Sequence, residues 1–328
     1  MATIRDVAKH AGVSVATVSR YLNAKGYVSV ETAQAVQKAI SELNYEMNAV
    51  ARSLTTKQSN LIGLILPDIT NPFFPELARA VEDVALTYGY TVVLCNSDEN
   101  PVKERNYIET LEKKYVAGFI VTSSQQNRDL YMKLKKPMVA LDRPIDASIP
   151  CVISSNRQGV KDSTKSLIAS GCKELLFVEG PDHIQSASER KQGFEEAMLG
   201  VTDVAHHHIQ ANFHFDESYE KVKAYLTTHT EVDGIVTSSD VAALGAIRAC
   251  TELGLHIPTD IQIIGFDGIQ LGEMLSSPLS TVRQDIYKLG AMAARILIKQ
   301  VENEPLEKMY YEVPVEIVHR GTTRSETS

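Results

Sequence analysis

Two different hydrophobic patterns divide the chain near residue 60. Before that point, apolar residues recur every three or four positions, as they do on amphipathic helices. After it, apolar runs of strand length recur, and stretches with helical spacing separate most of them; the runs are 61–67, 90–96, 118–124, 137–143, 174–180, 234–240 and 261–268. We therefore predict a small helical region followed by a larger region of alternating strands and helices.

The first 47 residues carry the pattern of a helix-turn-helix domain. Thr3 with Asp6 is a plausible capping start for the first helix, and Gly12 provides a tight turn before Ser14 caps a second helix over 15–22. A third helix is predicted over 30–43. Two short helices joined by a glycine turn and supported by a third form the helix-turn-helix arrangement.

The larger region, residues 61–328, reads as two α/β lobes with parallel sheets. Its strands are nearly continuous apolar runs, which is typical of parallel sheets covered by helices on both faces. We expect an amino-terminal lobe of 61–160 plus 286–320, and a carboxy-terminal lobe of 161–285 plus 321–328. Because open α/β sheets bind ligands beyond the carboxyl ends of their strands, the polar residues that end these strands are the candidate site.

The charge is distributed unevenly along the chain. Its 328 residues include 33 basic and 41 acidic ones, for a net charge of −8. The first sixty residues hold seven basic and four acidic residues, a net +3, which leaves −11 for the remainder. A basic head on an acidic body suggests that the head binds a polyanion.

Several function classes are disfavoured by what the sequence lacks. We expect no membrane span and no secretion signal, because no apolar run reaches about 18 residues and the first ten residues are polar. The four cysteines form no CxxC pair, which suits a cytoplasmic protein. Nucleotide-binding and hydrolase signatures are missing, so we predict neither an enzyme nor a cofactor. His206, His207 and His208 are expected to form an exposed turn, and no metal is predicted.

The stretch IRDVAKHAGVSVATVSRYLN, at residues 4–23, closely resembles the head of the lactose/galactose-repressor family of bacterial transcription regulators. A recognition helix needs small or polar residues that can approach base edges in the major groove, and Val15, Ala16, Thr17, Ser19 and Arg20 provide them. The resemblance implies that Val15 and Ala16 discriminate bases. Contacts with the DNA backbone are expected from Thr3, Ser14, Asn23 and Tyr45.

Residues 48–60 resemble the hinge helix and linker of the same family. The resemblance implies that this segment becomes helical on the operator and that Leu54 enters the minor groove between base steps. Asn48, Ala51 and Arg52 are the other DNA-binding candidates here. Since one head is small, we expect a homodimer on a palindromic double-stranded operator.

The body resembles the periplasmic sugar-binding proteins, above all the ribose-binding type. Five segments carry the resemblance: Asn71–Phe74, Leu141–Arg143, Arg190 with Gly193-Phe194, Gly265–Gly268 and Thr281–Gln284. A neutral sugar needs aromatic plates on its faces and polar groups around its hydroxyls. The resemblance implies a neutral sugar effector, with ribose the first choice. The candidate effector-binding residues are Asn71, Phe73, Phe74, Ser123, Asp142, Arg143, Arg190, Ser239, Phe266, Asp267 and Gln284, with Asn71 and Gln284 as supports.

Two departures from the ribose-binding pattern leave the ligand open. Ser123 and Ser239 stand where that pattern carries asparagine, which would give a roomier pocket and suit a larger sugar such as sucrose. An aromatic residue of 211–216, Phe213 or Phe215, is a candidate for a further plate.

The sequence therefore predicts a dimeric repressor that a small sugar releases from its operator. A second hypothesis is a catabolite-control regulator whose corepressor is a phosphorylated phosphocarrier protein. An enzyme or a plain sugar carrier is a third, and the helix-turn-helix head speaks against it.

Overall fold

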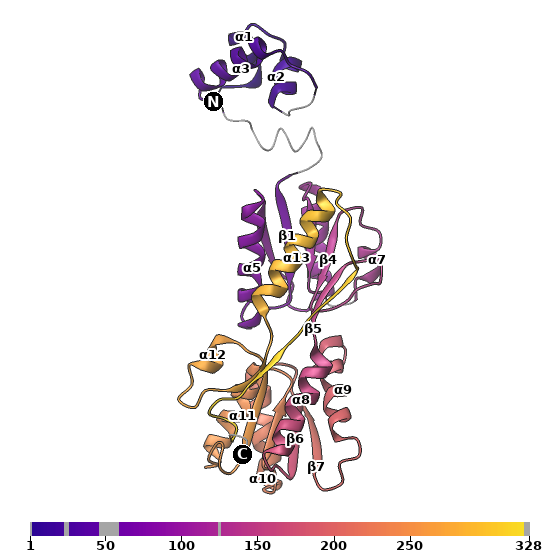
Figure 1. Ribbon diagram of the computed structural model, residues 1–328, viewed down its shortest axis with the longest axis vertical. Helices are drawn as coiled ribbons and strands as arrows, with labels where there is room; N and C mark the ends of the chain where they lie inside the picture. Colours follow the sequence, from indigo (N-terminus) through magenta and orange to yellow (C-terminus); the bar gives the residue numbers. More distant parts are fainter. Residues whose placement is uncertain (1, 23–25, 46–58, 124–125, 325–328) are drawn as a thin grey trace. The chain divides into compact units, whose positions relative to one another are not determined.

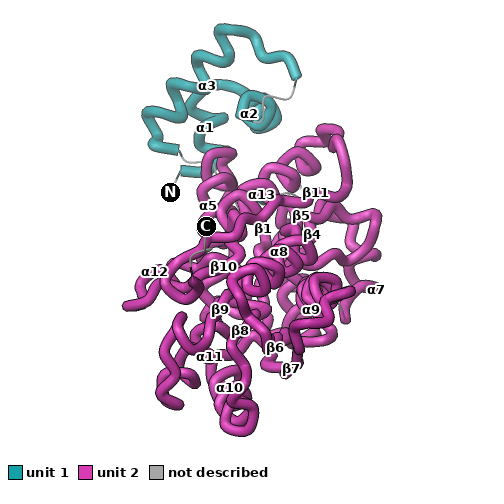
Figure 2. The backbone as a smooth tube through the Cα atoms, turned by 60° about the horizontal axis from the view of Figure 1, so that its bottom comes forward, with its two compact units in different colours: residues 1–59 teal, residues 60–328 magenta. Residues whose placement is uncertain are grey.

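The computed structural model describes residues 2–22, 26–45, 59–123 and 126–324. The chain forms two compact units, residues 1–59 and 60–328, which Figure 2 shows in different colours. No helix in the described ranges is long and apolar enough to cross a membrane.

The first unit contains three helices around a small core. Helix α1 spans Ile4–His10, α2 spans Val15–Leu22 and α3 spans Val30–Glu42. Their core consists of Val7, Ala8, Val18, Val36 and Ala39. Gly12 lies in the turn between α1 and α2 with φ +67°, a conformation that glycine adopts without steric cost. The predicted helix-turn-helix arrangement is confirmed.

The second unit consists of two α/β lobes, each built on a six-stranded sheet (Figure 1). The first-lobe sheet has the order β11-β5-β4-β3-β1-β2 and is parallel throughout. Its strands are β1 (Leu61–Leu66), β2 (Thr91–Asn96), β3 (Gly118–Val121), β4 (Met138–Leu141), β5 (Cys151–Ser154) and β11 (Tyr310–Val313). Its helices are α5 (Phe73–Thr87), α6 (Pro101–Lys113), α7 (Arg128–Tyr131) and α13 (Ile286–Val301).

The second-lobe sheet has the order β12-β10-β9-β8-β6-β7, with β12 antiparallel to β10. Its strands are β6 (Glu174–Glu179), β7 (Ala205–Gln210), β8 (Gly234–Thr237), β9 (Gln262–Asp267), β10 (Ser280–Arg283) and β12 (Glu316–Val318). Its helices are α8 (Asn156–Ala169), α9 (Gln185–Met198), α10 (Phe215–Thr228), α11 (Asp240–Glu252) and α12 (Gln270–Glu273). Because both lobes carry apolar clusters on both sheet faces, each sheet is buried as its sequence predicts.

The chain passes between the lobes three times, and two of these passages lie a few residues before the expected limits of about 160 and about 320. Helix α8 begins at Asn156 and packs on second-lobe strands, so the first passage precedes the expected residue 160. Strand β12 joins the second sheet at Glu316, so the third passage precedes the expected residue 320. Such passages are hard to place from sequence because the chain there is extended or begins a helix, and neither state interrupts the local apolar pattern.

The histidine run is a correction to the sequence prediction. His206, His207 and His208 lie in β7, at the edge of the second sheet, and not in a turn. His207 Nε2 contacts Glu174 Oε1, and His208 Nδ1 lies 2.7 Å from Glu179 Oε1. This strand carries polar residues on both of its faces, because an edge strand does not need continuous burial. The apolar pattern therefore did not predict it.

Candidate functional site

A cavity of about 760 Å³ lies between the two lobes of the second unit. The first lobe lines it with residues that follow β1, β2 and β4, and the second lobe lines it with residues that follow β6, β7, β8 and β9. All these segments follow the carboxyl ends of parallel strands, where α/β sheets hold their ligands. The size suits a small molecule with space to spare.

The β1–α5 segment supplies an aromatic wall. Asn71 Oδ1 accepts a hydrogen bond from the backbone N–H of Phe73 at 3.1 Å, which fixes the turn into α5. The rings of Phe73 and Phe74 meet edge to face, with centroids 5.1 Å apart and planes at 87°. Both phenylalanines line the cavity, so this turn presents apolar surface to a bound molecule.

Arg143 and Asp142 follow β4 and form the polar side of the first lobe. The side chain of Arg143 is buried, and its Nη1 lies 2.8 Å from Glu99 Oε1 and donates to the backbone oxygen of Ser123 at 3.3 Å. Its Nε lies 3.7 Å from Asp142 Oδ2. Sequence reasoning missed Glu99, although its position shortly after β2 was the signal that could have found it.

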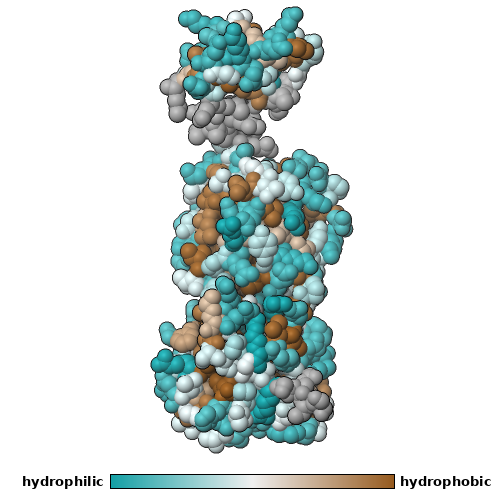
Figure 3. All heavy atoms as spheres, turned by 60° about the vertical axis from the view of Figure 1, so that its left-hand side comes forward, coloured by the Kyte–Doolittle hydropathy of each residue, from teal (hydrophilic) through white to brown (hydrophobic). Residues whose placement is uncertain are grey.

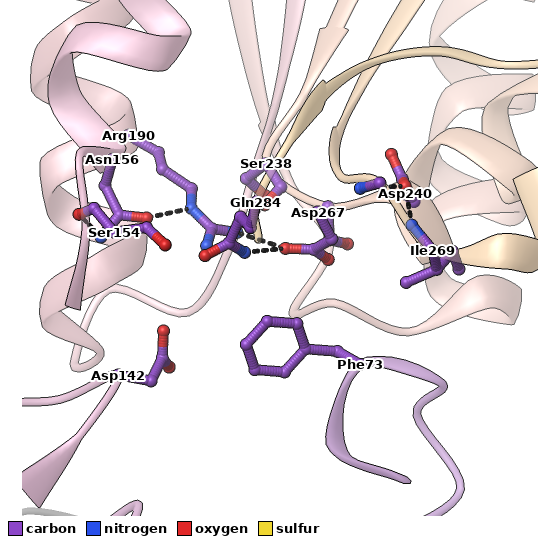
Figure 4. A network of polar contacts seen from close by, with 12 residues as sticks. Phe73, Asp142, Ser154, Asn156, Arg190, Ser238, Asp240, Asp267, Ile269 and Gln284 are labelled. Atoms are coloured by element: carbon purple, nitrogen blue, oxygen red, sulfur yellow. Dashed lines mark hydrogen bonds and ion pairs between the residues drawn. The ribbon is translucent and has the colours of Figure 1, made fainter. Parts of the chain in front are cut away.

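Arg190 is the centre of the second-lobe network (Figure 4). Its Nε donates to Asn156 Oδ1 at 2.9 Å, and its Nη1 donates to the backbone oxygen of Ser238 at 2.6 Å. The same Nη1 lies 3.3 Å from Asp267 Oδ1. The guanidinium also lies over the ring of Phe266, 3.8 Å from its centroid. These contacts fix the planar group in one orientation, as bidentate recognition of a polar ligand requires.

Asp267 is buried at the end of β9 and lines the cavity. Gln284 Nε2 donates to Asp267 Oδ1 at 2.7 Å. Burial raises the pKa of Asp267 to about 7, against the opposing effect of Arg190. Burial likewise raises the pKa of Asp240, at the start of α11, to about 6. Both carboxyl groups therefore favour the protonated form more than a solvated aspartate does.

We expect the free energy of unfolding to fall as the pH rises from about 4, the ordinary aspartate pKa. The fall should continue through the raised pKa values of Asp240 and Asp267. In this window the unfolded chain has released both protons while the folded chain still binds them. Urea unfolding at pH 5 and pH 8 measures the loss, which we expect to be on the order of 4 kcal/mol for the two groups together. The Asp267→Asn variant should show a smaller loss than the original chain, and an equal loss would contradict the assignment.

Eight of the eleven predicted effector residues line the cavity; they are Asn71, Phe73, Phe74, Asp142, Arg143, Arg190, Ser239 and Asp267. Phe213 and Phe215 both line it as well. The other three do not line it. Ser123 is fully buried beside Glu104, Phe266 belongs to the second-lobe core beneath Arg190, and Gln284 acts through Asp267, the supporting position expected of it.

The predicted recognition face in the first unit is accessible. Val15 at 41% exposure, Ala16 and Arg20 are exposed, whereas Thr17 and Ser19 are partly exposed. Val18 is fully buried, as expected of a core residue. The exposed residues begin on the first turn of α2, the part of a recognition helix that reaches base edges.

Two of the predicted backbone-contacting residues also cap helices. Thr3 forms a capping box with Asp6 at the start of α1, and Ser14 Oγ accepts a hydrogen bond from Thr17 N at 3.1 Å at the start of α2. Tyr45 is partly buried against the core of the first unit. Asn23, Asn48, Ala51, Arg52 and Leu54 lie outside the described residues.

Comparisons with known proteins match the whole length of the chain. The model of the lacI family of bacterial regulatory proteins matches residues 3–48. The model of periplasmic binding proteins and the sugar-binding domain of the LacI family matches residues 59–318. A ribose operon repressor of Halalkalibacterium halodurans is 53% identical over 324 residues, which cover 99% of this chain and 98% of the relative.

Two solved structures agree with these matches. The lac repressor dimer bound to operator and an anti-inducer has a TM-score of 0.84 and 27% identity, and the match covers 99% of both chains. A LacI-family regulator of Enterococcus faecium with bound ribose has a TM-score of 0.74 and 26% identity, over 82% of this chain and 100% of that one. The predicted fold of head and two-lobed body is confirmed.

Proposed function

This chain belongs to the LacI family of bacterial regulatory proteins, and we propose that it is a repressor whose operator binding is relieved by D-ribose. It is a sugar-responsive transcriptional repressor, and the identity of the sugar is the proposed part. The observation that carries the proposal is the cleft, in which the residues predicted for ribose come together from both lobes.

The charge of the cleft favours a neutral sugar over a sugar phosphate. Two arginines, Arg143 and Arg190, line the cavity. So do four acidic side chains and two histidines: Asp68, Glu99, Asp142, Asp267, His183 and His214. Both guanidinium groups already face carboxylates within the protein. A phosphate would therefore meet guanidinium groups that acidic side chains already engage, whereas sugar hydroxyls can donate to carboxylates and accept from arginine.

The position of the two serines favours ribose over a larger sugar. Ser239 lines the cavity, but its Oγ accepts a hydrogen bond from Ala242 N at 3.1 Å as the cap of α11. Ser123 lies outside the cavity lining. Of the two serines that suggested sucrose, only Ser239 therefore lines the pocket, and its hydroxyl also caps α11.

The first unit is the proposed operator-binding part, and a homodimer is the proposed form. Edge strand β2 and helix α5 carry exposed apolar side chains, among them Leu86 and Leu94, which are available for pairing of two copies. Figure 3 shows hydrophobic residues gathered on the first lobe on the face that carries α5. Two heads on a palindromic operator would provide the affinity that one small head lacks. We place this activity in the cytoplasm, where operator DNA is found.

Closure of the lobes around ribose is the proposed switch. A ligand that binds the closed form better shifts the protein toward it, and operator must weaken ribose binding by the same factor. Couplings of this kind amount to about 1–3 kcal/mol, or roughly 5- to 150-fold in affinity.

A ligand panel tests the proposal. We expect ribose to raise the unfolding temperature of the full-length protein and to weaken binding of an operator duplex, while ribose 5-phosphate and sucrose do neither. At about 100 times its dissociation constant, ribose should add roughly 2.7 kcal/mol to stability. Stabilisation by sucrose or ribose 5-phosphate in place of ribose would overturn the choice of effector. Unchanged operator affinity at saturating ribose would overturn the switch.

A further inference from the structure

One side chain of the second lobe is buried in the core of the first. Ile269 is 1% exposed and belongs to the cluster formed by α5, α13 and the first sheet, which includes Phe73, Phe74 and Ile286. Within the described ranges, the other fully buried members of this cluster all come from the first lobe. Val241 and Leu244 of α11 pack against the same cluster and are partly buried. The lobes therefore share an apolar contact beside the cleft.

The backbone that carries Ile269 is held rigidly by Asp240. The N–H groups of Gly268 and Ile269 both donate to Asp240 Oδ2, at 2.7 and 2.8 Å. The hydroxyl of Thr281 donates to Asp240 Oδ1 at 2.6 Å. Gly268 has φ +79°, and a Cβ there would lie 2.9 Å from the Cα of Arg283. The segment is thus fixed to its own lobe by hydrogen bonds and by close packing.

This rigid segment also carries an effector-facing group. Asp267 lines the cavity, and Ile269 lies two residues further along the chain. Figure 4 shows Asp267, Asp240 and Ile269 together, with Phe73 of the first lobe nearby. A movement of the second lobe that brings Asp267 toward a bound molecule therefore also moves Ile269 relative to the first-lobe core.

We propose that Ile269 is a positioning residue that stabilises the closed arrangement of the two lobes and so sets how tightly the effector is held. It would do this without touching the effector, since Ile269 does not line the cavity. Parting the lobes would expose its apolar side chain to water, which is unfavourable. The apparent affinity of a ligand for a closed state falls in proportion to the population of that state. The role of ribose in this inference rests on the proposed function.

The test compares Ile269→Ala with a matched truncation in the same strand region, Ile263→Ala. Ile263 is fully buried in the second-lobe cluster, whose described members all come from the second lobe. Both variants lose the same atoms from a buried site, so both should unfold at a lower temperature. We expect the dissociation constant for ribose, measured by calorimetry, to rise about tenfold or more in Ile269→Ala and less than about threefold in Ile263→Ala.

A second readout does not depend on the effector. Small-angle scattering of the ligand-free proteins should give a larger radius of gyration for Ile269→Ala than for the original chain or Ile263→Ala. Ile269→Val, which keeps most of the apolar contact, should restore compactness and ribose affinity. If ribose binds none of these proteins, the proposal that ribose is the effector is wrong. The radii of gyration then test the role of Ile269 on their own. Equal radii together with equal ribose affinities in the two alanine variants would overturn the inference.

Discussion

Replacing Arg190 with alanine is expected to abolish the response to ribose at ordinary concentrations and leave a repressor that stays on its operator. The guanidinium makes three polar contacts in the second lobe, to Asn156, Ser238 and Asp267, and packs on Phe266. Removing one partner of a buried ion pair costs about 3–5 kcal/mol, because the other charge stays buried without compensation. Here the group left without its partner is the carboxyl of Asp267, whose charged form is already disfavoured by burial and by Asp240 and Asp142.

We expect the ribose dissociation constant of Arg190→Ala to rise about 100-fold, because charge-assisted hydrogen bonds contribute about 1.5–3 kcal/mol each. Arg157→Ala is the matched control. Arg157 lies in the same lobe on α8, is largely exposed, and pairs with Glu196 away from the cavity lining. Calorimetry measures the affinity, and operator binding without sugar shows that the variant is folded. Ribose affinity within threefold of the original in a folded Arg190→Ala would remove this residue from the site.

The Arg190→Lys variant separates the effect of the positive charge from the effect of the planar guanidinium geometry. Lysine keeps the positive charge near Asp267 but cannot donate to Asn156, Ser238 and Asp267 from one rigid plane. We expect it to recover stability while recovering little ribose affinity. Full recovery of affinity would mean that the site needs only a cation here.

Removal of residues 1–59 is expected to abolish specific operator binding and to leave ribose binding within about twofold of the full-length value. The division between the two compact units lies at residues 59 and 60, and the exposed recognition residues Val15, Ala16 and Arg20 are all in the first unit. The described residues that line the cavity all belong to the second unit. Specific affinities exceed non-specific ones by about 10³–10⁷, so the loss should be at least a thousandfold.

Electrophoretic mobility shifts with a specific and a scrambled duplex measure the first expectation, and calorimetry with ribose measures the second. A charge-neutral control is the full-length Val15→Ala, Ala16→Gly variant, which should lose discrimination between the duplexes while keeping non-specific binding. Specific operator binding by the fragment would show that the body reads DNA, and loss of ribose binding would show that the units do not act independently.

Local patterns predicted the positions of the elements better than the directions of their side chains. The helix-turn-helix head followed from capping residues, the Gly12 turn and helical spacing, all of which act within a few residues. Buried strands such as β1 and β9 were evident because a strand covered on both faces needs continuous apolar residues. Five strands were missed. Four of them, β5, β10, β11 and β12, are only three or four residues long, and β7 lies at the edge of its sheet.

The sequence by itself determined that this protein has a small helical head, two parallel α/β lobes and polar residues gathered where strands end. These features depend on the spacing of residues along the chain, and that spacing is fixed before the chain folds. Asn71, Asp142 and Asp267 could be assigned to one cleft for this reason, since parallel strands bring their carboxyl ends to the same edge.

Only the tertiary structure decided which neighbouring side chain faces the cleft and which faces the core. Phe266 adjoins Asp267 in sequence, yet it lies beneath Arg190, because successive residues of a strand point to opposite faces. Glu99 meets Arg143, and Ile269 enters the core of the other lobe, through contacts between segments far apart in the chain. Such contacts depend on how whole elements pack, and no local pattern of apolar and polar residues records that packing.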